Sequence, residues 1–85
     1  MVEVFRTNVT EVSDASRILD ALHTRCTLYI ANFDLDDRDR ILRVKPLVGD
    51  VDATLVIDTL RRQGFEAEVL SDEISLLSGR LNTPV

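Results

Sequence analysis

Two carboxylates spaced three residues apart, Glu11 and Asp14, are the side chains in this sequence best placed to bind a ligand. They stand where a helical pattern begins, so both fall near a predicted helix N-terminus. Carboxylate oxygens suit hard divalent cations, and this makes the pair a candidate metal site. Acidic groups at this place also complement the helix dipole and cap open N–H groups without any ligand. Because Ca²⁺ takes about six to eight oxygens, we expect this structural role and no bound metal.

A second acidic segment, Asp34–Asp39, begins like a calcium-binding EF-hand loop. Arg38, however, stands where the third oxygen ligand is required, and Asp39 replaces the glycine of the turn. Asp and Arg are ordinary residues at the end of a sheet. We therefore predict a solvated turn at this position.

The only histidine, His23, and the only cysteine, Cys26, lie close together in the sequence. A Cys-His nucleophile also needs an orienting group and a pocket, which so short a chain seldom supplies. A histidine in the last turn of a helix is explained by the negative helix end, and a cysteine at a strand start by packing. We predict that the protein is not an enzyme and uses no cofactor.

Composition narrows the class of protein and of partner. The 85 residues carry a net charge of −5, and 45% of them are apolar, which is typical of one small globular domain. The acidic balance (pI about 4.6) opposes attraction to nucleic acid or to anionic membrane surfaces. One cysteine permits no internal disulfide, and the N-terminus lacks the pattern of a secretory signal. We expect a soluble cytoplasmic protein that binds neither nucleic acid nor membrane.

The elements that position these residues follow from the periodicity of the apolar residues. Alternating patterns predict strands, and repeats at helical spacing predict helices. The first helix would be capped by Ser13 or Asp14. The second would be capped by Asp50 or Asp52 and would end at Gly64. The predicted order is strand 2–7, helix 14–24, strand 26–33, strand 40–44, helix 53–63 and strand 65–69. This β-α-β-β-α-β order predicts an α+β, ferredoxin-like two-layer sandwich, in which both helices cover one face of a four-stranded antiparallel sheet. Residues 1–70 would form this domain and residues 71–85 a tail.

Strand alternation also predicts which side chains face the helices. On this basis the helix face carries Val2, Val4, Leu28, Ile30, Leu42, Val44, Ala67 and Val69. The opposite face then carries Phe5, Tyr29, Ala31, Phe33 and Ile41. Three aromatic rings on a bare face exceed what a small soluble monomer usually exposes. We predict an interaction face made of Phe5, Tyr29, Phe33 and Ile41, covered by a second subunit or another protein, or by a short helix over 71–78 in the tail, whose last residues we expect to be frayed.

Residues 8–22 and 62–69 carry a resemblance to a known family. The first segment resembles the loop and helix of heavy-metal-associated (HMA) domains, found in copper chaperones, metal-transporting ATPases and mercury-binding proteins. That family carries Gly-Met-Thr-Cys-x-x-Cys followed by a helix that usually ends Ala-Leu, and here Thr10 and Ala21-Leu22 fall at matching positions. The second segment, Arg62–Val69, is similar to the closing Gly-[Tyr/Phe]-x-Ala turn of the family. The resemblance spans about residues 2–70 and implies the same β-α-β-β-α-β fold.

The departure from the family lies at the two ligand positions, where Glu11 and Asp14 replace both cysteines. Cu(I) and Hg(II) are soft ions that require thiolates, and carboxylates are hard ligands. The resemblance therefore implies a domain that has kept the fold and lost soft-metal binding.

The sequence leaves two main functions open. The first is a small non-catalytic interaction or regulatory module that works through its open sheet face, as a homodimer or with another protein. The second is a binding domain for a hard divalent cation or small ligand through Glu11 and Asp14. Stacking of nucleic-acid bases on the aromatic residues is a weaker third reading, because no basic-aromatic run is present and the net charge is negative.

Overall fold

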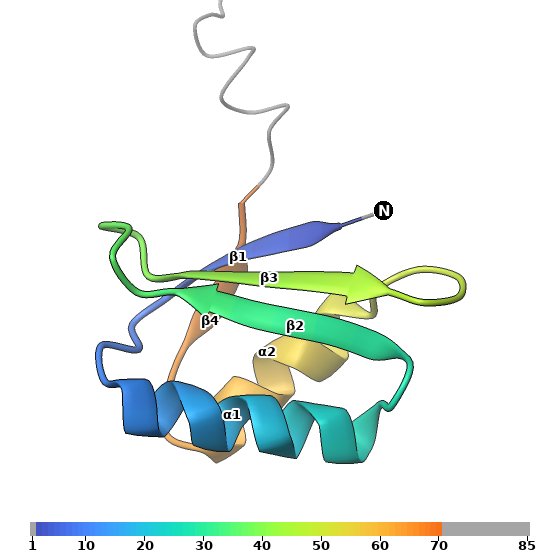
Figure 1. Ribbon diagram of the computed structural model, residues 1–85, viewed down its shortest axis with the longest axis horizontal. Helices are drawn as coiled ribbons and strands as arrows, with labels where there is room; N and C mark the ends of the chain where they lie inside the picture. The colour runs from blue at the N-terminus through green and yellow to red at the C-terminus, as the bar shows by residue number, and fades with distance from the viewer. Residues whose placement is uncertain (1, 71–85) are drawn as a thin grey trace, which may run out of the picture.

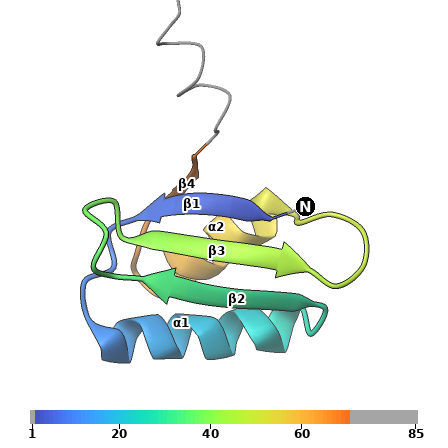
Figure 2. The ribbon, with the colours of Figure 1, turned by 45° about the horizontal axis from the view of Figure 1, so that its top comes forward.

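The computed structural model describes residues 2–70, which form a sheet with two helices on one side (Figures 1 and 2). The elements are β1 (Glu3–Thr7), α1 (Val12–Arg25), β2 (Tyr29–Asp34), β3 (Ile41–Pro46), α2 (Ala53–Arg62) and β4 (Ala67–Val69). The sheet order is β2-β3-β1-β4, and every neighbouring pair is antiparallel. The predicted ferredoxin-like α+β fold is confirmed. The predicted tail, with its helix over 71–78, lies outside the described residues.

Helix α1 buries Ala15, Ile18 and Leu22 against the sheet, as its spacing predicts. It begins earlier than predicted, because the Glu11 carbonyl already accepts from the amide of Ala15 at 3.0 Å. Glu11 is the N-cap residue, and its side chain makes no capping hydrogen bond. The predicted N-caps, Ser13 and Asp14, instead lie inside the first turn.

Helix α2 has both of its predicted end signals. The Asp52 side chain is the N-cap and accepts from the amide of Leu55 at 3.2 Å. Gly64 follows the C-cap with φ +91°, a left-handed conformation that glycine adopts without steric cost. The strand that follows, β4, has only three residues, fewer than predicted.

The hydrophobic core lies between the sheet and the helices, and it contains the aromatic residues predicted for the open face. Phe5 and Tyr29 are buried at 0% and 6% exposure, and Phe33 packs against the same core. In the register both Phe5 and Phe33 lie opposite Leu42, a core residue of the helix face. The predicted interaction face is therefore wrong for Phe5, Tyr29 and Phe33.

The error comes from the strands in which both alternating sets contain apolar residues. In β3 the charges of Arg43 and Lys45 fix the outward set, and Leu42 and Val44 face the helices as predicted. In β1 and β2 the residues Val4 and Ile30 compete with the aromatic set, and they take the open face. The larger aromatic side chains bury more apolar area, so the core takes them.

Candidate functional site

The two candidate metal ligands lie where the loop after β1 enters α1, Glu11 at the N-cap and Asp14 in the first turn, and their environments differ. Glu11 is exposed, whereas the Asp14 carboxylate forms an ion pair with Arg17 at 2.9 Å. Arg17 also donates through Nε to the side-chain oxygen of Gln63 at 3.2 Å, so Asp14 and Arg17 join α1 to the end of α2. Within residues 2–70, no group of three or more His, Cys, Asp or Glu side chains is placed to hold a metal ion.

The acidic segment between β2 and β3 forms the predicted turn. The Asp37 carboxylate accepts from the amide of Asp39 at 2.9 Å, and the Asp37 carbonyl accepts from the amide of Arg40 at 3.0 Å. Arg40 has φ +50°, and its carbonyl accepts from the Thr7 hydroxyl at 2.6 Å, which ties the turn to β1. The carboxylate of Asp37 therefore has a structural role in the turn.

His23 and Cys26 both lie at the C-terminal end of α1, and the structure gives them different surroundings. His23 is exposed in the last turn. Cys26 is the C-cap, packs partly buried against the core, and donates its amide to the Leu22 carbonyl at 2.9 Å. Among the described residues, no hydrogen bond connects the two side chains.

The open sheet face has a charged end, next to the turn between β2 and β3. Arg6 forms ion pairs with Glu68 at 3.1 Å and with Asp39 at 3.5 Å, and Arg43 lies 3.9 Å from Asp34. Ile41 lies in register with Arg6 and Asp34 but is only 5% exposed. Ile41 is therefore no contact surface, contrary to prediction.

The opposite end of this face is apolar. Leu28, Ile30, Leu47 and Val2 are 46% to 55% exposed, and we call these four residues the apolar end. Leu28 and Leu47 are adjacent, because the Leu47 amide donates to the Leu28 carbonyl at 2.7 Å. Ile30 lies opposite Lys45 in the register, so a cation interrupts this apolar surface.

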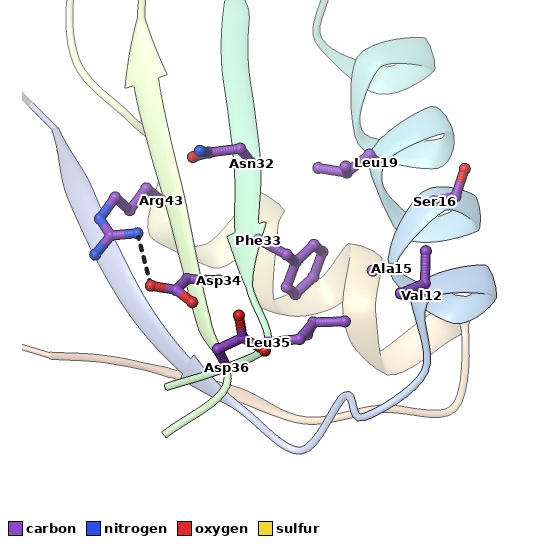
Figure 3. Close-up of a pocket in the computed structure, with 10 residues that line it drawn as sticks. All are labelled: Val12, Ala15, Ser16, Leu19, Asn32, Phe33, Asp34, Leu35, Asp36 and Arg43. Carbon is purple, nitrogen blue, oxygen red and sulfur yellow. Dashed lines mark ion pairs between the residues drawn. The ribbon is translucent and has the colours of Figure 1, made fainter. Parts of the chain in front are cut away.

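A cleft of about 620 Å³ runs between α1 and the outer edge of β2 (Figure 3). On the helix side it is mostly apolar, lined by Val12, Ala15, Leu19, Phe33 and Leu35 together with Ser16. On the other side of β2 its lining is polar and includes Asn32, Asp34 and Arg43. The cleft thus extends around β2, and its lining is mostly apolar on the helix side of the strand and polar on the other side.

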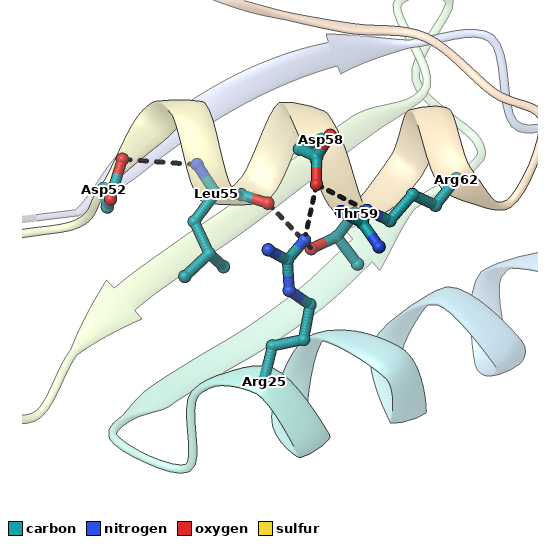
Figure 4. Close-up of polar contacts among 6 residues, drawn as sticks. All are labelled: Arg25, Asp52, Leu55, Asp58, Thr59 and Arg62. Carbon is teal, nitrogen blue, oxygen red and sulfur yellow. Dashed lines mark hydrogen bonds and ion pairs between the residues drawn. The ribbon is translucent and has the colours of Figure 1, made fainter.

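A polar network between α1 and α2 was not predicted from the sequence (Figure 4). The Arg25 guanidinium donates to Asp58 and to the Thr59 hydroxyl, each at 2.9 Å, and Arg62 donates to the same Asp58 oxygen at 2.7 Å. The hydrogen bonds from Arg62 and Arg25 lower the pKa of Asp58 below its ordinary value. The spacing of Asp58 and Arg62 in the sequence predicts an ion pair between neighbouring turns of α2. The contact of Arg25 with Asp58 joins two helices, and no pattern in the sequence predicts it.

Neither described helix is long and apolar enough to cross a membrane. Comparisons of the chain with protein-family models, with curated proteins and with solved structures gave no match.

Proposed function

We propose that this protein is a small non-catalytic interaction module with an HMA-like fold, and that its open sheet face binds a second copy of the same chain. The observation that carries the proposal is the apolar end, where four large apolar side chains are about half exposed on one surface. An apolar patch is complementary to its own copy, so the symmetric pairing of two such patches is the simplest assembly.

The size of the apolar end sets the expected strength of this dimer. Complete burial of a large apolar side chain contributes roughly 1.5–3 kcal/mol, so a half-exposed one adds about 1 kcal/mol. Eight such side chains across two copies give about 8 kcal/mol, against an association cost of roughly 4–15 kcal/mol. At the lower end of that cost about 4 kcal/mol remains, so the expected dimer is weak, with a dissociation constant of about 1 mM.

The test is sedimentation and NMR diffusion between about 0.02 and 2 mM protein, a range that brackets the expected dissociation constant. Wild type should shift from monomer to dimer across this range, and Ile30→Ser should remain monomeric. Val12→Ser is the matched control, because Val12 is 77% exposed on α1 and lies outside the apolar end. A wild type that stays monomeric throughout, or an equal effect of both substitutions, contradicts the proposal.

The HMA-like origin is supported by the position of Glu11 and Asp14, which follow β1 and open α1 in a β-α-β-β-α-β domain. Carboxylates in place of thiolates should give no stoichiometric capture of Cu(I) in competition with a chromogenic chelator at neutral pH. Copper binding that is lost in a Glu11→Ala, Asp14→Ala variant would contradict this view.

Hard-cation binding at the same loop is the competing function. The ion pair between Asp14 and Arg17 favours the interaction module, because the Asp14 carboxylate already pairs with a guanidinium and would have to give up this contact to bind a cation. Calorimetric titration with Ca²⁺, Mg²⁺, Mn²⁺ and Zn²⁺ should therefore show no saturable heat. Saturable heat that disappears in Asp14→Asn would favour the cation site instead.

A further inference from the structure

The outer edge of β2 has unpaired backbone N–H and C=O groups, and the register with β3 shows which residues they belong to. Leu28 accepts from the Leu47 amide, so its carbonyl points toward β3, and alternate residues along the strand repeat this direction. Tyr29 lies opposite Pro46, which has no N–H to donate, and this places Tyr29 in the other set. The N–H and C=O groups of Tyr29, Ala31 and Phe33 therefore point away from β3, and no other described strand pairs with them.

The two edges of the sheet differ in how well they are protected against strand addition. Strand β4 has three residues, with Glu68 inside it and Glu66 directly before it, features that discourage pairing with another chain. The β2 edge has six residues, and neither Pro nor Lys occurs in the strand. A strand of this length with an open edge is a template for pairing.

The cleft beside β2 defines the side-chain chemistry of an added strand. Successive side chains of a strand point to opposite faces, so every second one would enter the space between β2 and α1 (Figure 3). That space is mostly apolar, with the Phe33 ring, Leu35 and the exposed side chain of Val12 around it. The remaining side chains would lie on the open-face side of the cleft, toward Asn32 and Asp34.

The residues that line the cleft have two carboxylates and one guanidinium, a small negative balance. Asp36 lines it, is exposed, and forms no ion pair within residues 2–70. Asp34 lies 3.9 Å from Arg43, which is the only cation in the lining of the cleft. A second copy of β2, with the sequence Tyr-Ile-Ala-Asn-Phe-Asp, would bring no cation to these carboxylates.

We propose that the β2 edge and its cleft bind an extended peptide from a partner protein, with apolar residues alternating with Lys or Arg, as an additional strand of the sheet. The apolar residues enter between β2 and α1, the cations face Asp34 and Asp36, and the backbone pairs with Tyr29, Ala31 and Phe33. The inference rests on the proposed interaction role and names a second surface for it, the outer edge of β2, whereas the apolar end lies on the open face of the sheet.

The probe is a ten-residue synthetic peptide of alternating Val and Lys, titrated into the full-length protein at low ionic strength. Amide hydrogen exchange followed by NMR should show new protection at Tyr29, Ala31 and Phe33. Ile30, Asn32 and Asp34 already bond to β3 and should change little. N-methylation of alternate residues of the peptide removes its donors and keeps its side chains, so it should abolish the protection.

Charge is tested with a matched pair of variants, Asp36→Lys at the cleft and Asp50→Lys at an exposed position outside it. The first should weaken peptide binding by about three- to tenfold and the second by less than about twofold. Replacing the Lys residues of the peptide by Glu should also abolish binding.

The proposal is overturned by binding without protection of the outward amides, by equal binding of the N-methylated peptide, or by equal loss of binding in the two variants. Protection of the same amides that rises with protein concentration alone would assign the edge to a second copy and also overturn it. Repeating the titration with Leu47→Ser, a change in the apolar end that lies outside β2, separates the two proposals, because weakening of the dimer should leave peptide binding intact.

Discussion

Tyr29 contributes to the fold through both parts of its side chain. Its ring is buried in the core, and its hydroxyl accepts from the amide of Asp52 at 2.6 Å. Asp52 in turn caps α2 through its own carboxylate. A residue predicted from strand alternation to bind a partner is therefore the link between β2 and the start of α2.

Tyr29→Phe should lower the free energy of unfolding by about 1 kcal/mol, because it removes one hydrogen bond and leaves the ring in place. Urea denaturation measures this change. The control is Ile30→Thr, a change at the next, exposed position, which should alter stability by less than about 0.5 kcal/mol. Equal changes in the free energy of unfolding for the two substitutions would contradict the buried, hydrogen-bonded position of Tyr29.

Asp58 should make the stability of the protein depend on pH. Hydrogen bonds from Arg62 and Arg25 lower its pKa in the folded state, so the stabilisation is present above the ordinary Asp pKa of about 3.9. It is lost as the pH falls through the lowered folded-state pKa. The melting temperature of wild type should therefore exceed that of Asp58→Asn at pH 7, and the difference should shrink as the pH falls below about 4.

Thermal melts at pH 7 and at several acidic pH values test this. When Arg62 is also replaced by Ala, the difference in melting temperature between Asp and Asn at position 58 should already be smaller at pH 7. A difference that stays constant at every pH would show that Asp58 does not act through its charge.

The two helices differ in how they begin. Asp52 caps α2 with its side chain, whereas Glu11 occupies the N-cap of α1 without a side-chain bond. The Glu11 backbone is extended, with φ −104° and ψ 138°, which suits a short capping side chain.

Glu11→Ser should stabilise the protein by about 0.5–1 kcal/mol, because the serine hydroxyl reaches an open amide of the first turn. Asp52→Ala is the opposing change and should destabilise it by about 1 kcal/mol. Chemical denaturation of both variants gives the comparison. Destabilisation by Glu11→Ser would mean that the glutamate has a role beyond capping.

At the level of elements, the sequence is informative wherever a single signal dominates. The stripe of α2 and the stop at Gly64 are confirmed, and Arg43 and Lys45 fix the orientation of β3. In β2 the polar Asn32 shares its parity with Ile30, and that was the available sign that Ile30 faces outward. The polar residues of a strand thus indicate its outward face when both alternating sets contain apolar residues.

At the scale of the whole molecule, the order of elements predicts the fold, because connection rules leave few topologies for β-α-β-β-α-β. The candidate sites were not predictable in the same way. The cleft depends on how far α1 lies from the edge of β2, and the contact of Arg25 with Asp58 depends on how the two helices cross. Both distances follow from core packing, which no local pattern in the sequence encodes.

The pairing of the first and last described strands determines how this fold responds to mechanical force. β1 and β4 are antiparallel neighbours, and Phe5 lies opposite Val69, so the start of β1 and the end of β4 share one end of the sheet. A tension applied through residues 2 and 70 therefore loads the hydrogen bonds of this pair one after another, as a zipper opens, and not all together in shear. With only three residues in β4, the domain should yield at low force when it is pulled by these two points, even though its core is well packed.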